Sequence, residues 1–202
     1  MNSAFTLSTV PAELQWKSQP LDWAVGPDGS LSILAGEATD WFIDPAGGYV
    51  SDTAPAALFS PPDESFLLSA RASVDFASAF DAGFIQVRAA DDRWAKFCFE
   101  YSPAQQPMVV SVVTRGVSDD CNSTVIDGRE VYLRVAETPG TIAFHYSRDG
   151  SFWNLARYFG LERTSSLQVG FSSQSPTGKK CSAVFSEIIY RAGALKDNRT
   201  GE

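Results

Sequence analysis

The segment from Ser65 to Phe76 alternates, with one interruption, between apolar and polar side chains. Successive side chains of a β-strand point to opposite faces, so the pattern predicts a strand with one buried and one solvated face. Similar short segments, separated by turn residues, recur as far as Phe171. The series predicts an all-β fold, a sandwich of two antiparallel sheets. The predicted buried row of the first segment is Phe66, Leu68, Ala70, Ala72, Val74 and Phe76.

Length and charge narrow the classes of protein that the chain can belong to. The 202 residues, 44% of them hydrophobic, fit one sandwich domain spanning residues 1–202. The polar end, residues 193–202, is expected to fray. The net charge is −8 and the basic residues are scattered, which argues against a nucleic-acid partner. No apolar run approaches the ~20 residues of a membrane helix, so no membrane partner is predicted.

Cysteine usage indicates the compartment. The three cysteines, Cys98, Cys121 and Cys181, are odd in number and form no Cys-x-x-Cys pair. This pattern argues against a disulfide framework and against a zinc site. The first twenty residues lack a basic start followed by an apolar stretch, so they do not resemble a secretory signal. We therefore predict a cytoplasmic protein.

The sequence predicts neither a cofactor nor a metal. It contains no glycine-rich phosphate-binding motif and no Gly-x-Ser-x-Gly nucleophile motif. An alternative is that acidic loops bind calcium. The candidate ligands are Asp40, Asp44 and Asp52 in one region and Asp119 and Asp120 in another. Calcium needs six to eight oxygens, so these loops serve only if the fold gathers them. Loop aspartates more often cap turns.

The strongest candidate site lies on the predicted strand from Trp94 to Tyr101. Phe97 and Phe99 belong to its apolar row, which leaves Lys96 and Glu100 on the other face. If the neighbouring strands are adjacent in one sheet, their outward-facing residues form one patch. An aromatic ring in this patch can stack on a sugar ring, and its polar groups can hydrogen-bond the sugar hydroxyls. Ordinary solvated strand residues are the simpler explanation. The candidate ligand-binding residues are Gln86, Arg88, Trp94, Lys96, Glu100, Arg134 and His145.

Two predicted loops add secondary candidates. Asp40 and Trp41 follow one strand, and Ser118 and Asp119 follow another. Turn residues next to core aromatics would produce the same pattern.

Several short motifs, taken in order, resemble a known family. The chain is similar to the uncharacterised proteins with a concanavalin A-like sandwich that include the yeast regulator of enolase. The resemblance implies a jelly roll, and in its wider group of lectins and glucan-cleaving enzymes the concave sheet is the usual site. Where the family has Ser-Asp-Trp, this chain has Ser118-Asp119-Asp120, which removes one aromatic ring. The motifs are Thr39-Asp40-Trp41-Phe42, Phe80-Asp81-Ala82-Gly83-Phe84 with Val87-Arg88, Trp94-Ala95-Lys96 with Glu100, Ser111-Val112-Val113-Thr114-Arg115-Gly116 with Ser118-Asp119, Ser147-x-Asp149-Gly150 with Trp153, and Gln174-Ser175-Pro176.

The main hypothesis is a non-catalytic binding protein that uses the concave sheet face. Its ligand would be a carbohydrate or a protein partner such as a metabolic enzyme. A structural reading, in which the patch is an oligomer interface, leaves the oligomeric state open.

The alternative is a glycoside hydrolase or lyase with Glu100 as one catalytic carboxylate. Glycosidases usually need two carboxylates. Glucanases of this fold place theirs as Glu-x-Asp-x-Glu, whereas this strand has Lys96-x-Cys98-x-Glu100. The candidates for a second acid are Asp40, Asp75, Asp81 and Glu187.

Overall fold

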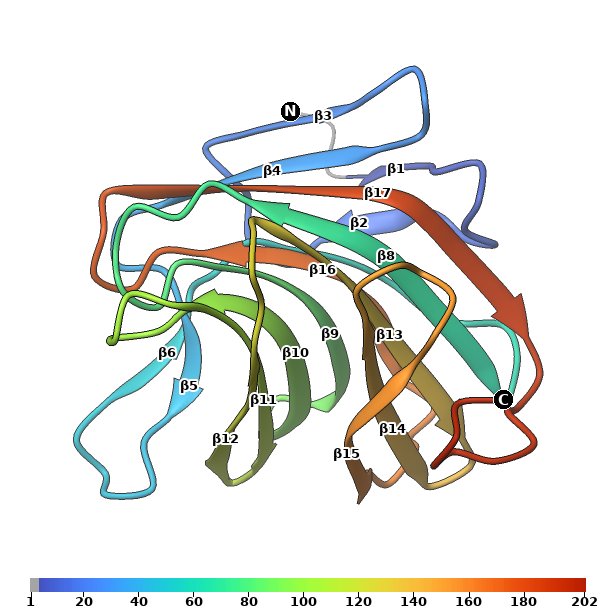
Figure 1. Ribbon diagram of the computed structural model, residues 1–202. Coiled ribbons are helices and arrows are strands. Elements are labelled where there is room, and N and C mark those ends of the chain that lie inside the picture. Colours follow the sequence, from blue (N-terminus) through green and yellow to red (C-terminus); the bar gives the residue numbers. More distant parts are fainter. Residues whose placement is uncertain (1–3) are drawn as a thin grey trace.

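The computed structural model describes residues 4–202, which form seventeen strands and no helix. Sheet A has eight strands in the order β1-β2-β7-β16-β9-β10-β11-β12, and sheet B has seven in the order β15-β14-β13-β8-β17-β4-β3 (Figure 1). Sheet A comprises β1 (Ala4–Phe5), β2 (Leu14–Trp16), β7 (Ala56–Phe59), β9 (Ala82–Ala90), β10 (Arg93–Tyr101), β11 (Pro107–Arg115), β12 (Val117–Val125) and β16 (Gln168–Gln174). Sheet B comprises β3 (Asp22–Val25), β4 (Leu31–Gly36), β8 (Phe66–Val74), β13 (Glu130–Thr138), β14 (Thr141–Ser147), β15 (Asn154–Gly160) and β17 (Lys180–Ala192).

A small hairpin stands outside the two sheets. It consists of β5 (Trp41–Ile43) and β6 (Val50–Asp52), and it lies beside the β10–β12 edge of sheet A (Figure 1). The backbone amide of Ile43 donates to Ser118 Oγ over 2.9 Å, which ties the hairpin to β12. Ser118 is buried and also shares a hydrogen bond of 2.8 Å with Thr114.

The main hydrophobic core fills the space between the sheets. The whole predicted row of the first segment, from Phe66 to Phe76, is buried in it. On β10, Phe97 and Phe99 point into the same core, whereas Lys96 points away from it to bond Asp40. The all-β, jelly-roll-like sandwich of antiparallel sheets is therefore confirmed, and so is the strand parity of β10.

One local prediction was wrong. Residues 117–125, whose Ser-Asp-Asp segment predicts a turn, form the edge strand β12. Pairing with β11 outweighs the local preference of Asp and Ser for turns.

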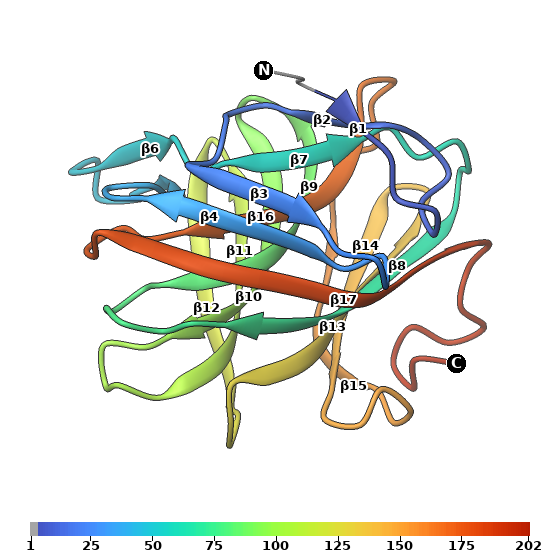
Figure 2. The same ribbon diagram turned by 90° about the horizontal axis from the view of Figure 1, so that it is seen from above.

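The polar C-terminal segment, residues 193–202, makes specific contacts with sheet B. It turns back from β17 and covers the face of sheet B that points away from the core (Figures 1 and 2). Arg134 Nη2 donates to the carbonyl of Gly201 over 2.9 Å, and His145 Nε2 lies 2.7 Å from the carbonyl of Asn198. The tail thus supplies backbone acceptors to two buried polar side chains.

We expect Gly201→Val to release this tail. Gly201 has a φ of +77°, and a Cβ there would lie 2.6 Å from Arg134 Nη2 and 3.1 Å from Trp153 Cβ. Hydrogen exchange should therefore speed up across residues 193–202, with a loss of about 1–3 kcal/mol in unfolding free energy. Gly29→Val is the control, because Gly29 has a φ of +79° and open space around it. Equal exchange in the two variants would contradict the contact.

Within residues 4–202 there is no helix long and apolar enough to cross a membrane.

Candidate functional site

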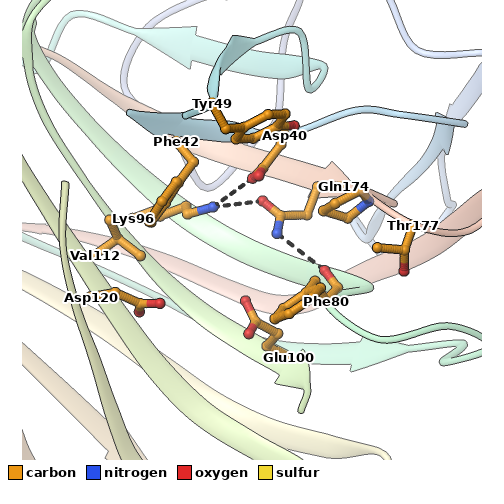
Figure 3. A pocket seen from close by; sticks show the side chains of 11 residues that line it. Asp40, Phe42, Tyr49, Phe80, Lys96, Glu100, Val112, Asp120, Gln174 and Thr177 are labelled. Atoms are coloured by element: carbon orange, nitrogen blue, oxygen red, sulfur yellow. Dashed lines mark hydrogen bonds and ion pairs between the residues drawn. The ribbon is translucent and has the colours of Figure 1, made fainter. Parts of the chain in front are cut away.

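A pocket of about 420 Å³ opens on the face of sheet A that points away from the core (Figure 3). Strands β10, β11 and β12 supply its floor, and the β5–β6 hairpin and the segments around Phe80 and Pro176 supply its walls. The lining residues are Asp40, Phe42, Tyr49, Phe80, Lys96, Glu100, Val112, Asp120, Gln174, Pro176 and Thr177.

Lys96 is the central cation of the pocket. Its side chain is only 3% exposed, and Nζ donates to Asp40 Oδ1 and to Gln174 Oε1, each over 2.9 Å. Burial by itself would lower the pKa of Lys96, but the negative charges nearby, Asp40 foremost, raise it above its usual value. Lys96 is therefore charged at neutral pH and is held by two acceptors.

Asp40 is fixed by the start of the hairpin. Its Oδ1 also accepts the backbone amide of Trp41 over 2.7 Å. The Trp41 indole donates to the carbonyl of Ala54 over 2.8 Å and packs edge-on against Trp94, with ring centroids 5.6 Å apart. Both rings are 1% exposed. The prediction that Trp94 offers a stacking surface was therefore wrong: the hairpin covers it, and it anchors the hairpin instead.

Glu100 and Asp120 form the acidic side of the pocket. Figure 3 shows their carboxylates pointing toward one another, away from the Lys96–Asp40 pair. Burial, with added repulsion from Asp120 and Asp40, raises the pKa of Glu100 to about 8 in spite of the attraction of Lys96. Burial likewise raises the pKa of Asp120. The predicted Lys96–Glu100 surface pair does not form, since Lys96 pairs with Asp40.

Aromatic rings line the pocket above this polar floor. They belong to Phe42, Tyr49 and Phe80, of which Tyr49 is 44% and Phe80 38% exposed. Phe80 has a φ of +70°, a left-handed backbone that bulky residues rarely adopt. Its carbonyl accepts Gln174 Nε2 over 3.1 Å.

The buried carboxylate of Asp81 holds the Phe80 loop in place. One of its oxygens accepts the amides of Ala77 and Ser78, over 3.0 and 2.8 Å, and the other accepts Ser175 Oγ over 2.7 Å. The loop before β9 and the end of β16 are thereby joined beside the pocket.

Gln86 and Arg88 share this face of sheet A but do not line the pocket. Gln86 lies opposite Lys96 in the β9–β10 register and is completely buried. Arg88 lies opposite Trp94 and pairs with Asp91 at the turn after β9.

Arg134 and His145 do not join the patch, so the prediction of one continuous site was wrong. They are paired on β13 and β14 of sheet B, where the C-terminal segment covers them. The Arg134 guanidinium lies 4.1 Å from the centre of the Trp153 ring. Burial lowers the pKa of His145 to about 4, so this histidine is neutral at physiological pH. Strand alternation reveals which face a residue occupies but not which sheet its strand joins.

Of the loop candidates, Asp40 lines the pocket and Ser118 anchors the hairpin beside it. Asp119 points elsewhere and pairs with Arg157 of sheet B over 3.1 Å. The calcium alternative gains no support: Asp44 accepts the amides of its own loop, and residues 4–202 contain no group of three or more His, Cys, Asp or Glu side chains placed to hold a metal ion.

Sequence reasoning missed several lining residues. Phe42, Phe80 and Gln174 belong to the quoted motifs, so the signal was present but was not assigned to a site. Asp120 was named only as a possible calcium ligand, although it stands where the family has an aromatic residue. Tyr49 lies between the hairpin strands, and no pattern indicated that it would reach the pocket.

Comparison with known structures agrees with the fold. A functionally unknown protein from Saccharomyces cerevisiae superimposes with a TM-score of 0.81 and 25% identity, over 95% of this chain and 100% of that one. The GH43 BlXynB protein from Bacillus licheniformis has a TM-score of 0.70 and 16% identity, over 89% of this chain and only 37% of that one. An alginate lyase from Klebsiella pneumoniae has a TM-score of 0.58 and 13% identity, over 87% and 86%. The last two likenesses show the fold alone.

Comparison of the sequence with curated proteins found no match. A family model does match, over residues 16–192, and its description is a protein of unknown function, DUF1349. The match includes every lining residue of the pocket and ends before the C-terminal segment. The chain therefore belongs to the DUF1349 family of proteins of unknown function.

Proposed function

We propose that this protein binds a carbohydrate in the pocket beneath the β5–β6 hairpin. The observation that carries the proposal is a set of aromatic rings above a hydrogen-bonding floor. Phe42, Tyr49 and Phe80 can stack on the apolar face of a sugar, and the polar groups below them can bond its hydroxyls. A volume of about 420 Å³ falls within the usual range for small-ligand sites.

The floor is already ordered. Lys96, Asp40 and Gln174 hold one another through two hydrogen bonds of 2.9 Å, so a ligand meets fixed charges and dipoles and not mobile side chains. Such preorganisation reduces the entropy lost on binding. Two proteins with similar folds are a GH43 protein and an alginate lyase, and this likeness favours a carbohydrate over other small molecules.

Tyr49→Ala should weaken sugar binding by about tenfold, equivalent to ~1.4 kcal/mol, because it removes one stacking ring. The measurement is titration calorimetry with glucose, glucosamine, N-acetylglucosamine and glucuronate. Tyr158→Ala is the matched control, since Tyr158 of β15 is 47% exposed on the other sheet. Equal loss in both variants, or none in either, would argue against this pocket as the binding site.

A second candidate function, a glycoside hydrolase or lyase, has one specific observation in its favour. A carboxyl with a pKa of about 8 is protonated at neutral pH, as a general acid must be, and Glu100 has that property. Asp40 and Asp120 line the same pocket. The test is to incubate the protein with an oligosaccharide and to measure new reducing or unsaturated ends. If such ends are released and Glu100→Gln abolishes their release, catalysis is the function.

A protein partner is the remaining binding hypothesis. The resemblance to a family that includes the yeast regulator of enolase suggests a metabolic enzyme such as enolase. Standard protein interfaces bury ~800 Å² on each partner, whereas this site is a concave pocket. A sugar is therefore the better match. If no sugar binds and enolase forms a complex that Tyr49→Ala disrupts, the partner hypothesis replaces the present one.

A further inference from the structure

We propose that the ligand is a cationic sugar, an amino sugar whose ammonium group lies between Glu100 and Asp120. This inference rests on the proposed carbohydrate function and specifies the class of sugar. It starts from an imbalance among the charged groups of the pocket.

Three carboxylates line the pocket, but only one has a cation. Asp40 is neutralised by Lys96 at 2.9 Å. Glu100 is only 8% exposed, yet within residues 4–202 its carboxylate takes part in no hydrogen bond and no ion pair. Asp120 has no ion-pair partner in the same part of the chain, although it lines the pocket. Figure 3 shows both carboxylates turned toward the pocket interior.

This arrangement is costly for the protein alone. Burial disfavours the charged form of both carboxylates, and at Glu100 the charge of Asp120 adds to this effect. Lys96 attracts both carboxylates, but its ammonium group is hydrogen-bonded to Asp40 and Gln174 and forms no ion pair with either of them. Glu100 is protonated near neutral pH in the free protein. A ligand ammonium group placed between the two side chains would favour release of this proton to solvent and would supply the missing cation through charge-assisted hydrogen bonds.

The aromatic rings of the pocket also favour a cationic ligand. The faces of Phe42, Tyr49 and Phe80 carry partial negative charge and attract a cation that comes close to them. A neutral sugar could stack on these rings but would leave the two carboxylates unpaired. An anionic sugar would add a further negative charge beside them. The net charge of −8 on the whole chain also attracts a cation and repels an anion.

The test is a series of sugars that share one ring and differ in charge. D-glucosamine is a cation, D-glucose and N-acetyl-D-glucosamine are neutral, and D-glucuronate is an anion. Titration calorimetry near neutral pH and low salt should give glucosamine an affinity at least about tenfold higher than that of either neutral sugar, with glucuronate the weakest. Added salt should reduce the preference for glucosamine.

Two isosteric variants locate the cation. Asp120→Asn and Glu100→Gln should each remove most of the preference for glucosamine over glucose, measured as the ratio of the two affinities in each variant. Asp119→Asn is the matched control, because this adjacent residue pairs with Arg157 and points away from the pocket. Retention of the full preference in both pocket variants would overturn the proposed position of the ammonium group.

The outcomes separate the two proposals. If glucose and glucosamine bind equally well in the wild-type protein, the inference about charge fails and the proposed carbohydrate function stands. If none of the four sugars binds to the folded protein, the carbohydrate function fails and the inference fails with it.

Discussion

Lys96→Met is expected to cost about 3–5 kcal/mol of unfolding free energy, the largest loss that we predict for any single change in this pocket. Methionine preserves the volume of the side chain but removes the cation. The carboxylate of Asp40 would then be buried without its partner, and Gln174 Oε1 would lose its donor. Urea denaturation with linear extrapolation measures the change.

Two further variants make the result specific. Asp40→Asn combined with Lys96→Met should recover much of the loss, because no uncompensated charge then remains. Lys17→Met is the surface control: Lys17 pairs with Asp91 only at 4.0 Å, so we expect less than about 1 kcal/mol. A Lys96→Met variant as stable as Lys17→Met would show that the buried pair does not carry this stability.

The second large effect is a dependence of stability on pH that Glu100→Gln should remove. In the folded protein the pKa of Glu100 is raised from 4.5 to about 8, mainly by burial, so folding favours the protonated acid. The unfolded chain releases this proton at its ordinary pKa. Between these two values the folded state binds more protons, and its stability falls as the pH rises.

The contribution of this single group falls by about 1.4 kcal/mol per pH unit and is lost above pH 8. Glutamine keeps the shape without the charge, so Glu100→Gln should be more stable than the wild type at alkaline pH by several kcal/mol, at most about 5. At pH 4 the two should be nearly equal. Denaturation curves collected from pH 4 to pH 9 test this expectation. Parallel curves for the two proteins would contradict it.

The class of fold could be predicted because alternation is a local property. Each strand needs one buried face, and the side chains of β8 and β10 reveal that face directly. Strand order is not local. Nothing in the residues of β13 and β14 distinguishes the outer face of sheet B from that of sheet A, so Arg134 and His145 were placed on the wrong sheet. The edge strand β12 was missed because hydrogen bonds from β11 stabilise a polar segment that would otherwise favour a turn.

The candidate site was predicted in part. Lys96, Glu100 and Asp40 were named from the sequence, and all three line one pocket. Trp94 was misjudged because the β5–β6 hairpin covers it, and a covering hairpin leaves no periodic signal on the strand beneath. The binding role of these residues, the nature of the partner and the cytoplasmic location stay predictions.

The backbone of Phe80 shows what this site costs the fold. A bulky residue held at a φ of +70° stores about 1–3 kcal/mol of strain, which a glycine at the same position would not. The strained backbone lowers the thermodynamic stability of the protein, and it places the aromatic ring of Phe80 at the pocket. A variant library selected only for thermostability should drift toward glycine there, and one selected for ligand capture should retain the aromatic residue.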